Sequence, residues 1–262
     1  MAELRALTKA EELAPRITAF MNQVVRLEEV DPFALRSLRR EIQELQRSDV
    51  LNAGALQCRL QSLMLDDDGL QATLRNMHLN NGSVMARLAE FADGALWLRA
   101  ARVQGLFQQV IQDRVLPLMQ LANFGLRAGA IQALVGALDA AQARNEVLQM
   151  TSVVHTVRKS HVAMKQLSAT DADFAPMLEV AGELLRERRI FPGWTAQIIS
   201  TDLNDGGPSV LMQYRLGISA EEAAEMNLEL VDRLVDRNLD RPGLYVGFVG
   251  AGNARNAILP DE

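Results

Sequence analysis

The sequence predicts a mostly α-helical protein, with antiparallel helical hairpins over residues 1–190 and a small α+β unit of ββαβ order over residues 191–262. Hydrophobic residues make up 48% of the 262 positions but aromatic residues only 5%, so Leu, Ala and Met must fill most of the core. Their unbranched or small side chains lose little rotamer freedom in a helix. Helical spacing of apolar residues continues through the first region, whereas strand-like alternation begins only in the second.

The charge balance and the cysteine content limit the classes of partner and compartment. The formal net charge of −6 argues against broad electrostatic binding to nucleic acid. Cys58 is the single cysteine, so no internal disulfide can form and a reducing compartment is expected. Residues 1–20 carry six charged side chains and therefore lack the apolar core of a signal peptide. We expect a cytoplasmic protein.

The first helices are predicted from apolar spacing and capping residues. A stripe of apolar residues over 17–27 indicates one helix. Asp31 and Pro32 then supply an N-cap and a proline in the first turn, which predicts the start of the next helix. Along that helix, apolar residues at steps of three and four predict a buried face made of Leu35, Leu38, Ile42 and Leu45.

Glycine-containing and polar segments divide the next region into short helices. We expect turns at residues 66–69 and 80–83, at Asp93-Gly94, and at Gly125 and Gly129. The runs around Gly94-Ala-Leu and Gly129-Ala-Ile look alike at a separation of 35 residues. This pair resembles tetratricopeptide-like helical hairpins, whose repeat is about 34 residues long. The resemblance implies stacked hairpins over about 60 residues.

Residues 115–138 form the one stretch apolar enough to test as a membrane span. Arg127 lies within it, and an arginine in the middle of a bilayer costs about 2.5 kcal/mol or more, so a buried helical hairpin is expected. The alternative is a helical protein that inserts into membranes through this stretch, of the pore-forming or translocator type. Gly125 and Gly129 stand at the spacing that permits close helix contact in lipid.

The C-terminal unit begins with two strand-like runs around a turn at 204–207, which predicts a β-hairpin. Ser219 and Glu222 match a capping box and predict the start of a helix. A right-handed crossover through that helix would let the last strand, 244–250, lie beside the first one. Val210, Met212, Tyr214 and Leu216 alternate with Leu211, Gln213 and Arg215, which predicts a strand that is apolar partly on both faces. For the helix, the spacing predicts one face made of Ala224, Leu228, Val231, Leu234 or Val235, and Leu239.

The segment "LYVGFVGAGNARNAI" at 244–258 resembles the opening of a dinucleotide-binding βαβ unit, as in pyrroline-carboxylate reductases. Such a site needs a helix N-terminus for the pyrophosphate and an acidic residue about 20 positions further on. Only ten residues follow Gly252, and Arg255 occupies the position of the third glycine. We therefore interpret Gly250 and Gly252 as a backbone turn and expect no nucleotide and no other cofactor.

Other residue types capable of chemistry have structural interpretations. His155 and His161 are six residues apart and so lie on different sides of a helix, unlike paired metal ligands. Cys58 is interpreted as a buried filler residue. The carboxylates at 66–68 are expected to cap the helix that follows, and 202–207 is expected to be a turn because it lacks the spacing of a calcium loop. We expect no metal site and no catalytic residue.

These observations favour a non-catalytic protein–protein interaction protein, such as an adaptor, chaperone or assembly subunit, that uses a helical surface and a sheet edge. A membrane-inserting protein is the alternative, and an enzyme with a cleft between the two regions is the third hypothesis. The partner is expected to be another protein or a second copy, not nucleic acid, a nucleotide or a membrane. The candidate partner-binding residues are Arg186, Arg188, Arg189, Trp97, Arg99 and Arg102.

Overall fold

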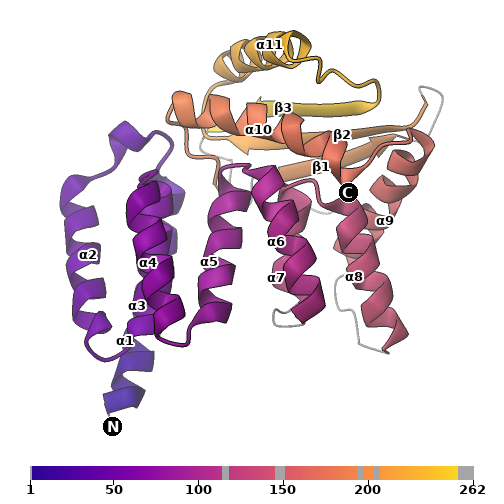
Figure 1. Ribbon diagram of the computed structural model, residues 1–262. Coiled ribbons are helices and arrows are strands. Elements are labelled where there is room, and N and C mark those ends of the chain that lie inside the picture. The colour runs from indigo at the N-terminus through magenta and orange to yellow at the C-terminus, as the bar shows by residue number, and fades with distance from the viewer. Residues whose placement is uncertain (1, 114–117, 145–150, 194–196, 203–206, 253–262) are drawn as a thin grey trace. The chain divides into compact units, whose positions relative to one another are not determined.

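The computed structural model describes residues 2–113, 118–144, 151–193, 197–202 and 207–252 (Figure 1). Within these ranges the chain is mostly helical, with eleven α-helices, one short 3-10 helix and three strands, so the predicted mostly-α class is confirmed. The α-helices are α1 (Ala2–Gln23), α2 (Pro32–Gln46), α3 (Val50–Leu63), α4 (Asp67–Leu79), α5 (Ser83–Leu96), α6 (Ala100–Asp113), α7 (Leu118–Arg127), α8 (Ile131–Ala143), α9 (Thr151–Gln166), α10 (Asp171–Glu187) and α11 (Ala220–Asp236).

The chain divides into two compact units. Unit 1 comprises Met1–Asp93 and Arg189–Phe191, and unit 2 comprises Gly94–Arg188 and Pro192–Glu262. This division differs from the boundary expected at residue 190. The helices from α6 to α10 belong to the same unit as the sheet because α9 packs on β1 and β2, and α10 packs on β3.

Unit 1 is built from helices that carry their own N-caps. The side chain of Asp31 accepts a hydrogen bond from the backbone N–H of Phe33 (2.8 Å), as the sequence predicts for the start of α2. Asp49 and Asp66 do the same for α3 and α4, accepting from Asn52 and Gly69 (both 3.0 Å). An acidic N-cap satisfies one orphan amide and lies at the positive end of the helix dipole. The predicted buried face of α2, made of Leu35, Leu38, Ile42 and Leu45, is confirmed.

Residues 189–191 complete unit 1 as a short extended segment. Ile190 forms an antiparallel bridge with Arg26. The N–H of Phe191 donates to the carbonyl of Val25 (2.9 Å), and the N–H of Leu27 donates to the carbonyl of Arg189 (3.0 Å). Ile190 and Phe191 are fully buried, which explains why this segment belongs with residues far away in the sequence.

The turns of unit 2 differ from the predicted ones at two positions. Gly94 lies inside α5 and Gly125 inside α7, so neither is a turn. The turns follow at Leu98 (φ 53°) and Gly129 (φ 66°), each in the left-handed conformation. In both, the next N–H donates to the carbonyl five residues back, Arg99 to Gly94 and Ala130 to Gly125 (both 2.8 Å), the pattern of a Schellman C-cap.

The two glycines inside these helices permit close packing instead. A Cβ on Gly94 would come within 2.6 Å of Val103, and one on Gly125 within 2.6 Å of Phe107. Matching the two turns by their Schellman bonds aligns Gly94 with Gly125, a shift of 31 residues, and not with Gly129 at the predicted shift of 35. The apparent 35-residue similarity therefore pairs a packing glycine with a turn glycine.

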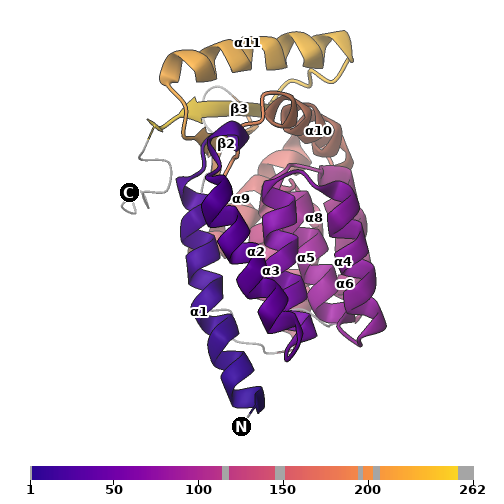
Figure 2. The same cartoon turned by 90° about the vertical axis from the view of Figure 1, so that its left-hand side faces the viewer.

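The sheet of unit 2 has the strand order β1-β2-β3, from β1 (Gln197–Asp202), β2 (Ser209–Leu216) and β3 (Leu244–Gly250). β1 is antiparallel to β2, and β3 is parallel to β2, with Tyr214 opposite Phe248. The last strand thus lies beside the second strand and not beside the first. The turn predicted at 204–207 falls largely on residues outside the described part. Figure 2 shows α11 running along β3.

One face of β2 is buried. Val210, Met212, Tyr214 and Leu216 are fully buried and alternate with partly exposed residues, so the strand has one buried face and is not buried on both. The hydroxyl of Tyr214 donates to the carbonyl of Arg127 (2.8 Å), which joins the sheet to the end of α7.

Of the stretch tested as a membrane span, the described residues 118–138 form α7 and most of α8, joined by the turn at Gly129. Arg127 is only 2% exposed, and its Nε–H donates to the carbonyl of Ala95 (2.9 Å). Among the described residues, none of the helices combines the length and the apolar character that a bilayer crossing requires.

The glycines that resemble a dinucleotide motif lie at the end of β3. A Cβ on Gly250 would collide with the carbonyl oxygen of Ser219, the N-cap of α11, so the close approach of two backbones requires glycine there. Gly252 has a φ of 50°, and its N–H donates to the carbonyl of Ile218 (3.1 Å). The remainder of the motif, from Asn253 onward, lies outside the described residues.

Candidate functional site

Helix α10 holds the ends of other helices in unit 2. Asp171, the first residue of α10, accepts hydrogen bonds from the N–H groups of Gln132 (2.9 Å) and Ala133 (3.0 Å) at the start of α8. The residue before α8, Ala130, has no side chain that could cap the helix. Burial raises the pKa of Asp171, and the backbone hydrogen bonds oppose that shift. Asp171 therefore acts as an N-cap supplied from another helix.

Two further side chains of α10 act in the same way on the α5–α6 turn. Glu179 accepts from the N–H of Ala101 (3.1 Å) in the first turn of α6, and burial raises its pKa. Arg186 donates from Nη1 to the carbonyl of Trp97 (2.6 Å), which directly follows α5. Figure 1 shows α10 lying across these helix ends.

The structure places the predicted partner-binding residues in different surroundings. It brings Trp97 and Arg186 together, but the Trp97 side chain is fully buried and the contact holds a turn. Arg188 forms an ion pair with Glu229 (2.5 Å), and Arg189 belongs to unit 1, where it pairs with Glu28. The remaining two, Arg99 and Arg102, lie at the start of α6. Partner binding through these six residues stays a prediction.

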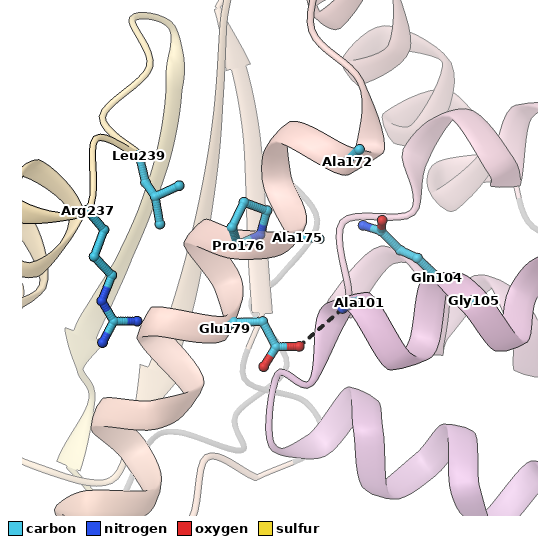
Figure 3. A pocket seen from close by; sticks show the side chains of 9 residues that line it. All are labelled: Ala101, Gln104, Gly105, Ala172, Ala175, Pro176, Glu179, Arg237 and Leu239. Carbon is cyan, nitrogen blue, oxygen red and sulfur yellow. Dashed lines mark hydrogen bonds between the residues drawn. The ribbon is translucent and has the colours of Figure 1, made fainter.

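A pocket of about 550 Å³ opens beside α10 (Figure 3). Small residues form much of its wall, and Glu179 and Arg237 are its charged groups. A Cβ on Gly105 would meet no atom within 4 Å, so this side of α6 is open. The pocket can accept a small apolar group, with Gln104 and Glu179 as polar contacts. Its lining residues are Ala101, Gln104, Gly105, Ala172, Ala175, Pro176, Glu179, Arg237 and Leu239.

Helix α11 has two apolar faces, one buried and one exposed. Its apolar residues are numerous enough to form two faces, and the spacing alone does not say which one meets β3. The predicted set includes Leu228 (70% exposed), Val231 (54%) and Val235 (51%), so these three residues lie on the exposed face. The face that is buried consists of Ala223, Met226, Leu230 and Leu234.

We call the exposed set Ala224, Leu228, Val231 and Val235 the α11 stripe. Its members are four, three and four residues apart, which places them on one side of the helix. Large apolar side chains that are more than 40% exposed in the described part of unit 2 are few, and three of them belong to this stripe. The full set is Val162, Leu228, Val231, Val235 and Tyr245.

One side of α11 is joined to α10 by ion pairs. Arg233 contacts both Glu187 (2.6 Å) on α10 and Glu229 on its own helix (2.5 Å). Through this hydrogen bond Arg233 holds the pKa of Glu187 below its ordinary value, and Arg188 does the same to the pKa of Glu229. Arg237 pairs with Glu183 (2.7 Å) one turn further along. These pairs orient α11 so that the stripe faces away from α10.

The other side of α11 contacts the backbone of β3. The side-chain amide of Asn227 donates to the carbonyl of Phe248 (2.8 Å), and its oxygen accepts from the N–H of the same residue (2.7 Å). A backbone group that bonds to Asn227 in this way is directed away from β2. Asn227 therefore occupies a position on the outer edge of β3 where another strand would bond.

The residues considered for metal binding or nucleophilic chemistry have structural contacts. Burial raises the pKa of the Cys58 thiol to about 12, so it is not a thiolate at neutral pH. A ring nitrogen of His78 lies 3.1 Å from the hydroxyl of Ser83. Asp66 caps α4, as predicted. The described residues contain no group of three or more His, Cys, Asp or Glu side chains placed to hold a metal ion.

Sequence reasoning missed Asp171 and Glu179, because each bonds to backbone amides 38 or more residues away and no local motif marks that contact. It placed the residues of the α11 stripe on one helix face but did not say whether that face is buried or exposed. Comparison with known protein families, with curated sequences and with solved structures gave no match to this chain.

Proposed function

We propose that this protein is a non-catalytic protein–protein interaction protein, such as an adaptor, chaperone or assembly subunit, and that unit 2 carries its binding surface. One observation carries the proposal: three large apolar side chains of α11, Leu228, Val231 and Val235, share one exposed face. Contiguous exposed apolar side chains bordered by polar ones are typical of interaction sites.

The buried or shifted carboxylates of unit 2 support the same proposal. Asp171 and Glu179 have raised pKa values, which is also common for catalytic acids. Here, however, each accepts hydrogen bonds from the amides at a helix start, and this accounts for its burial. They position α6 and α8 and need no substrate to explain them.

The sheet edge is the second predicted binding device. Asn227 already bonds to both backbone groups of Phe248 on the outer edge of β3. β1 is the opposite edge strand, and no strand lies beside its outer edge in the described residues. We therefore assign the partner first to the helical surface, and a strand-adding partner only to β1.

The test is affinity purification of the full chain from its native source, followed by reconstitution with each purified candidate. Leu228→Asp is the test variant. Leu79→Asp is the matched control because Leu79 is 83% exposed and lies in unit 1. We expect at least one purified partner to bind the unmodified protein and the Leu79→Asp variant equally well. Its affinity for the Leu228→Asp variant should be at least about tenfold lower. Equal binding to both variants would remove α11 from the proposal. Turnover of a substrate that copurifies with the unmodified chain would contradict the non-catalytic assignment.

A further inference from the structure

The two borders of the α11 stripe differ in chemistry. On one border lie four exposed carboxylates, Glu221, Glu225, Asp232 and Asp236. A helix turns about 100° per residue, which places these side chains directly beside the stripe and before the side that pairs with α10. None of the four forms an ion pair with another residue of the described part, in contrast to the neighbouring Glu229.

The second border is formed by β3. Ser219 lies against Gly250, and Asn227 against Gly247 and Phe248, so α11 and β3 run in opposite directions. With a rise of about 1.5 Å per helical residue and about 3.3 Å per strand residue, Tyr245 lies level with about residue 231. Tyr245 is 51% exposed. The stripe thus has carboxylates along one side and a strand with an exposed tyrosine along the other.

We propose that the α11 stripe binds an amphipathic helix of a partner protein whose apolar seam is bordered by Lys or Arg. This inference rests on the proposed function and adds the chemistry of the partner. Steps of four, three and four residues are those of an apolar helical seam, which matches the ridges of a second helix. The stripe is about 16 Å long, equal to about three turns of such a partner. The four carboxylates face the position of its cationic border.

Charge favours this occupant over a second copy of the chain or a membrane. If two copies paired through antiparallel α11 helices, the carboxylate border of one helix would lie against the carboxylate border of the other. Glu225 and Asp232 would then face the carboxylates of the other copy. The net charge of −6 also opposes self-association. An anionic lipid surface would be repelled by the same carboxylates, because surfaces of equal sign repel at short range.

The experiment measures fluorescence anisotropy of the full chain with three synthetic peptides of about 18 residues. The first has a Leu seam bordered by Lys, the second has the same composition in shuffled order, and the third has Glu in place of Lys. We expect the first to bind at least about tenfold more tightly than the others at about 50 mM NaCl. At about 500 mM NaCl we expect the affinity to fall, because salt screens the charge contribution and leaves the apolar one.

Two variants separate the seam from its charged border. Leu228→Asp should lose at least about tenfold in affinity for the Lys peptide. A double charge reversal, Glu225→Lys with Asp232→Lys, should weaken the Lys peptide and strengthen the Glu peptide. The matched control is Glu11→Lys with Glu12→Lys on exposed positions of unit 1, which changes the net charge equally. Circular dichroism melting curves establish that each variant is folded.

Several results would overturn the inference. Two of them concern the peptides: the shuffled peptide binds as tightly as the Lys peptide, or the unit 1 charge reversal weakens the Lys peptide as much as the α11 charge reversal does. The other two concern other occupants: the protein sediments as a dimer that Leu228→Asp dissociates, or it binds phosphatidylglycerol vesicles and Leu228→Asp abolishes that binding. The proposed function is judged separately with the purified native partner. Gly105→Trp in the α10 pocket could abolish binding of that partner while Leu228→Asp leaves it unchanged. The protein would then be an interaction protein whose partner site is not the α11 stripe. Catalytic turnover would contradict the function itself.

Discussion

Units 1 and 2 differ in how some of their helices begin. In unit 1, α2, α3 and α4 are each capped by the Asp that directly precedes them, Asp31, Asp49 and Asp66. In unit 2, α6 and α8 receive carboxylates from α10, namely Glu179 and Asp171. A local cap stabilises its helix whatever its neighbours do, whereas a cap from another helix exists only when both helices are packed. Unit 2 should therefore depend on α10 far more than unit 1 depends on any one helix.

The largest expected loss of stability comes from a change where α10 packs against the turn after α5. Gly182 lies so close to the turn after α5 that a Cβ would collide with the carbonyl oxygen of Trp97. Backbone cannot move aside cheaply, so we expect Gly182→Ala to lower the free energy of unfolding of unit 2 by about 3 kcal/mol. Urea denaturation followed by the fluorescence of Trp97, which is buried in unit 2, measures this loss in a Trp194→Phe background.

The matched change in unit 1 is Gly54→Ala in α3. Its Cβ would meet the Cγ of Met77 at 2.7 Å, an atom of a flexible side chain. Met77 is fully buried, so its shift has a cost, but a side chain moves more easily than backbone and Ala has the higher helix propensity, so the loss should be about 1–2 kcal/mol. Equal losses of stability for Gly182→Ala and Gly54→Ala would contradict the conclusion that unit 2 depends on α10 more than unit 1 depends on any one helix.

The second prediction compares a cap from another helix with a local one. Asp171→Ala leaves the amides of Gln132 and Ala133 without their acceptor inside a packed region. We expect a loss of about 2–3 kcal/mol in the free energy of unfolding. Asp49→Ala removes a local cap on the partly exposed end of α3, and the expected loss is about 1 kcal/mol.

Asp171→Asn serves as the control for this pair of variants. The Asn side chain keeps one acceptor oxygen, so part of the loss should be recovered. If Asp171→Ala costs no more than Asp49→Ala, α8 does not depend on α10 for its start.

This difference also explains what could be predicted from the sequence. The N-caps Asp31 and Ser219 are correct because an N-cap contacts amides two or three residues away, which a sequence pattern displays. Asp171 bonds across 38 and 39 residues and shows no such pattern. Turn positions failed for a related reason: Leu98 adopts a left-handed conformation with no glycine to mark it. Packing, not local preference, fixes that turn.

The buried face of α11 shows a further limit of sequence reasoning. Leu228 and Leu230 are equally apolar, yet one is 70% exposed and the other 1%. Helical period predicts that a helix has an apolar face, but with two such faces the choice is made by what β3 and α10 offer. The pairing of Asn227 with Phe248 and the ion pairs of Arg233 settle that choice.

The third prediction is a small gain in stability. Gly136 lies inside α8, is exposed, and has no atom within 4 Å of the position that a Cβ would take. Gly136→Ala should raise the free energy of unfolding by about 0.5–1 kcal/mol through helix propensity alone. Because α8 lacks its own side-chain cap, the same change in an Asp171→Ala background tests whether propensity can offset a missing cap. No gain in either background would mean that α8 does not limit the stability of unit 2.

The smallest expected effect is a pH-dependent one in the α10–α11 ion pairs. Glu187 and Glu229 have folded pKa values below their ordinary ones, so their contribution is present above the unfolded pKa of about 4.3 and is lost as pH falls through the folded values. Partly exposed pairs contribute little, so Arg233→Gln should cost about 0.5 kcal/mol at pH 7 and progressively less as the pH falls through the folded pKa values of Glu187 and Glu229. Arg16→Gln should behave alike in unit 1, since Arg16 lowers the pKa of Glu41. Urea midpoints at several pH values measure both, and a cost for Arg233→Gln that stays the same at every pH would show that Arg233 supports α11 by packing and not by charge.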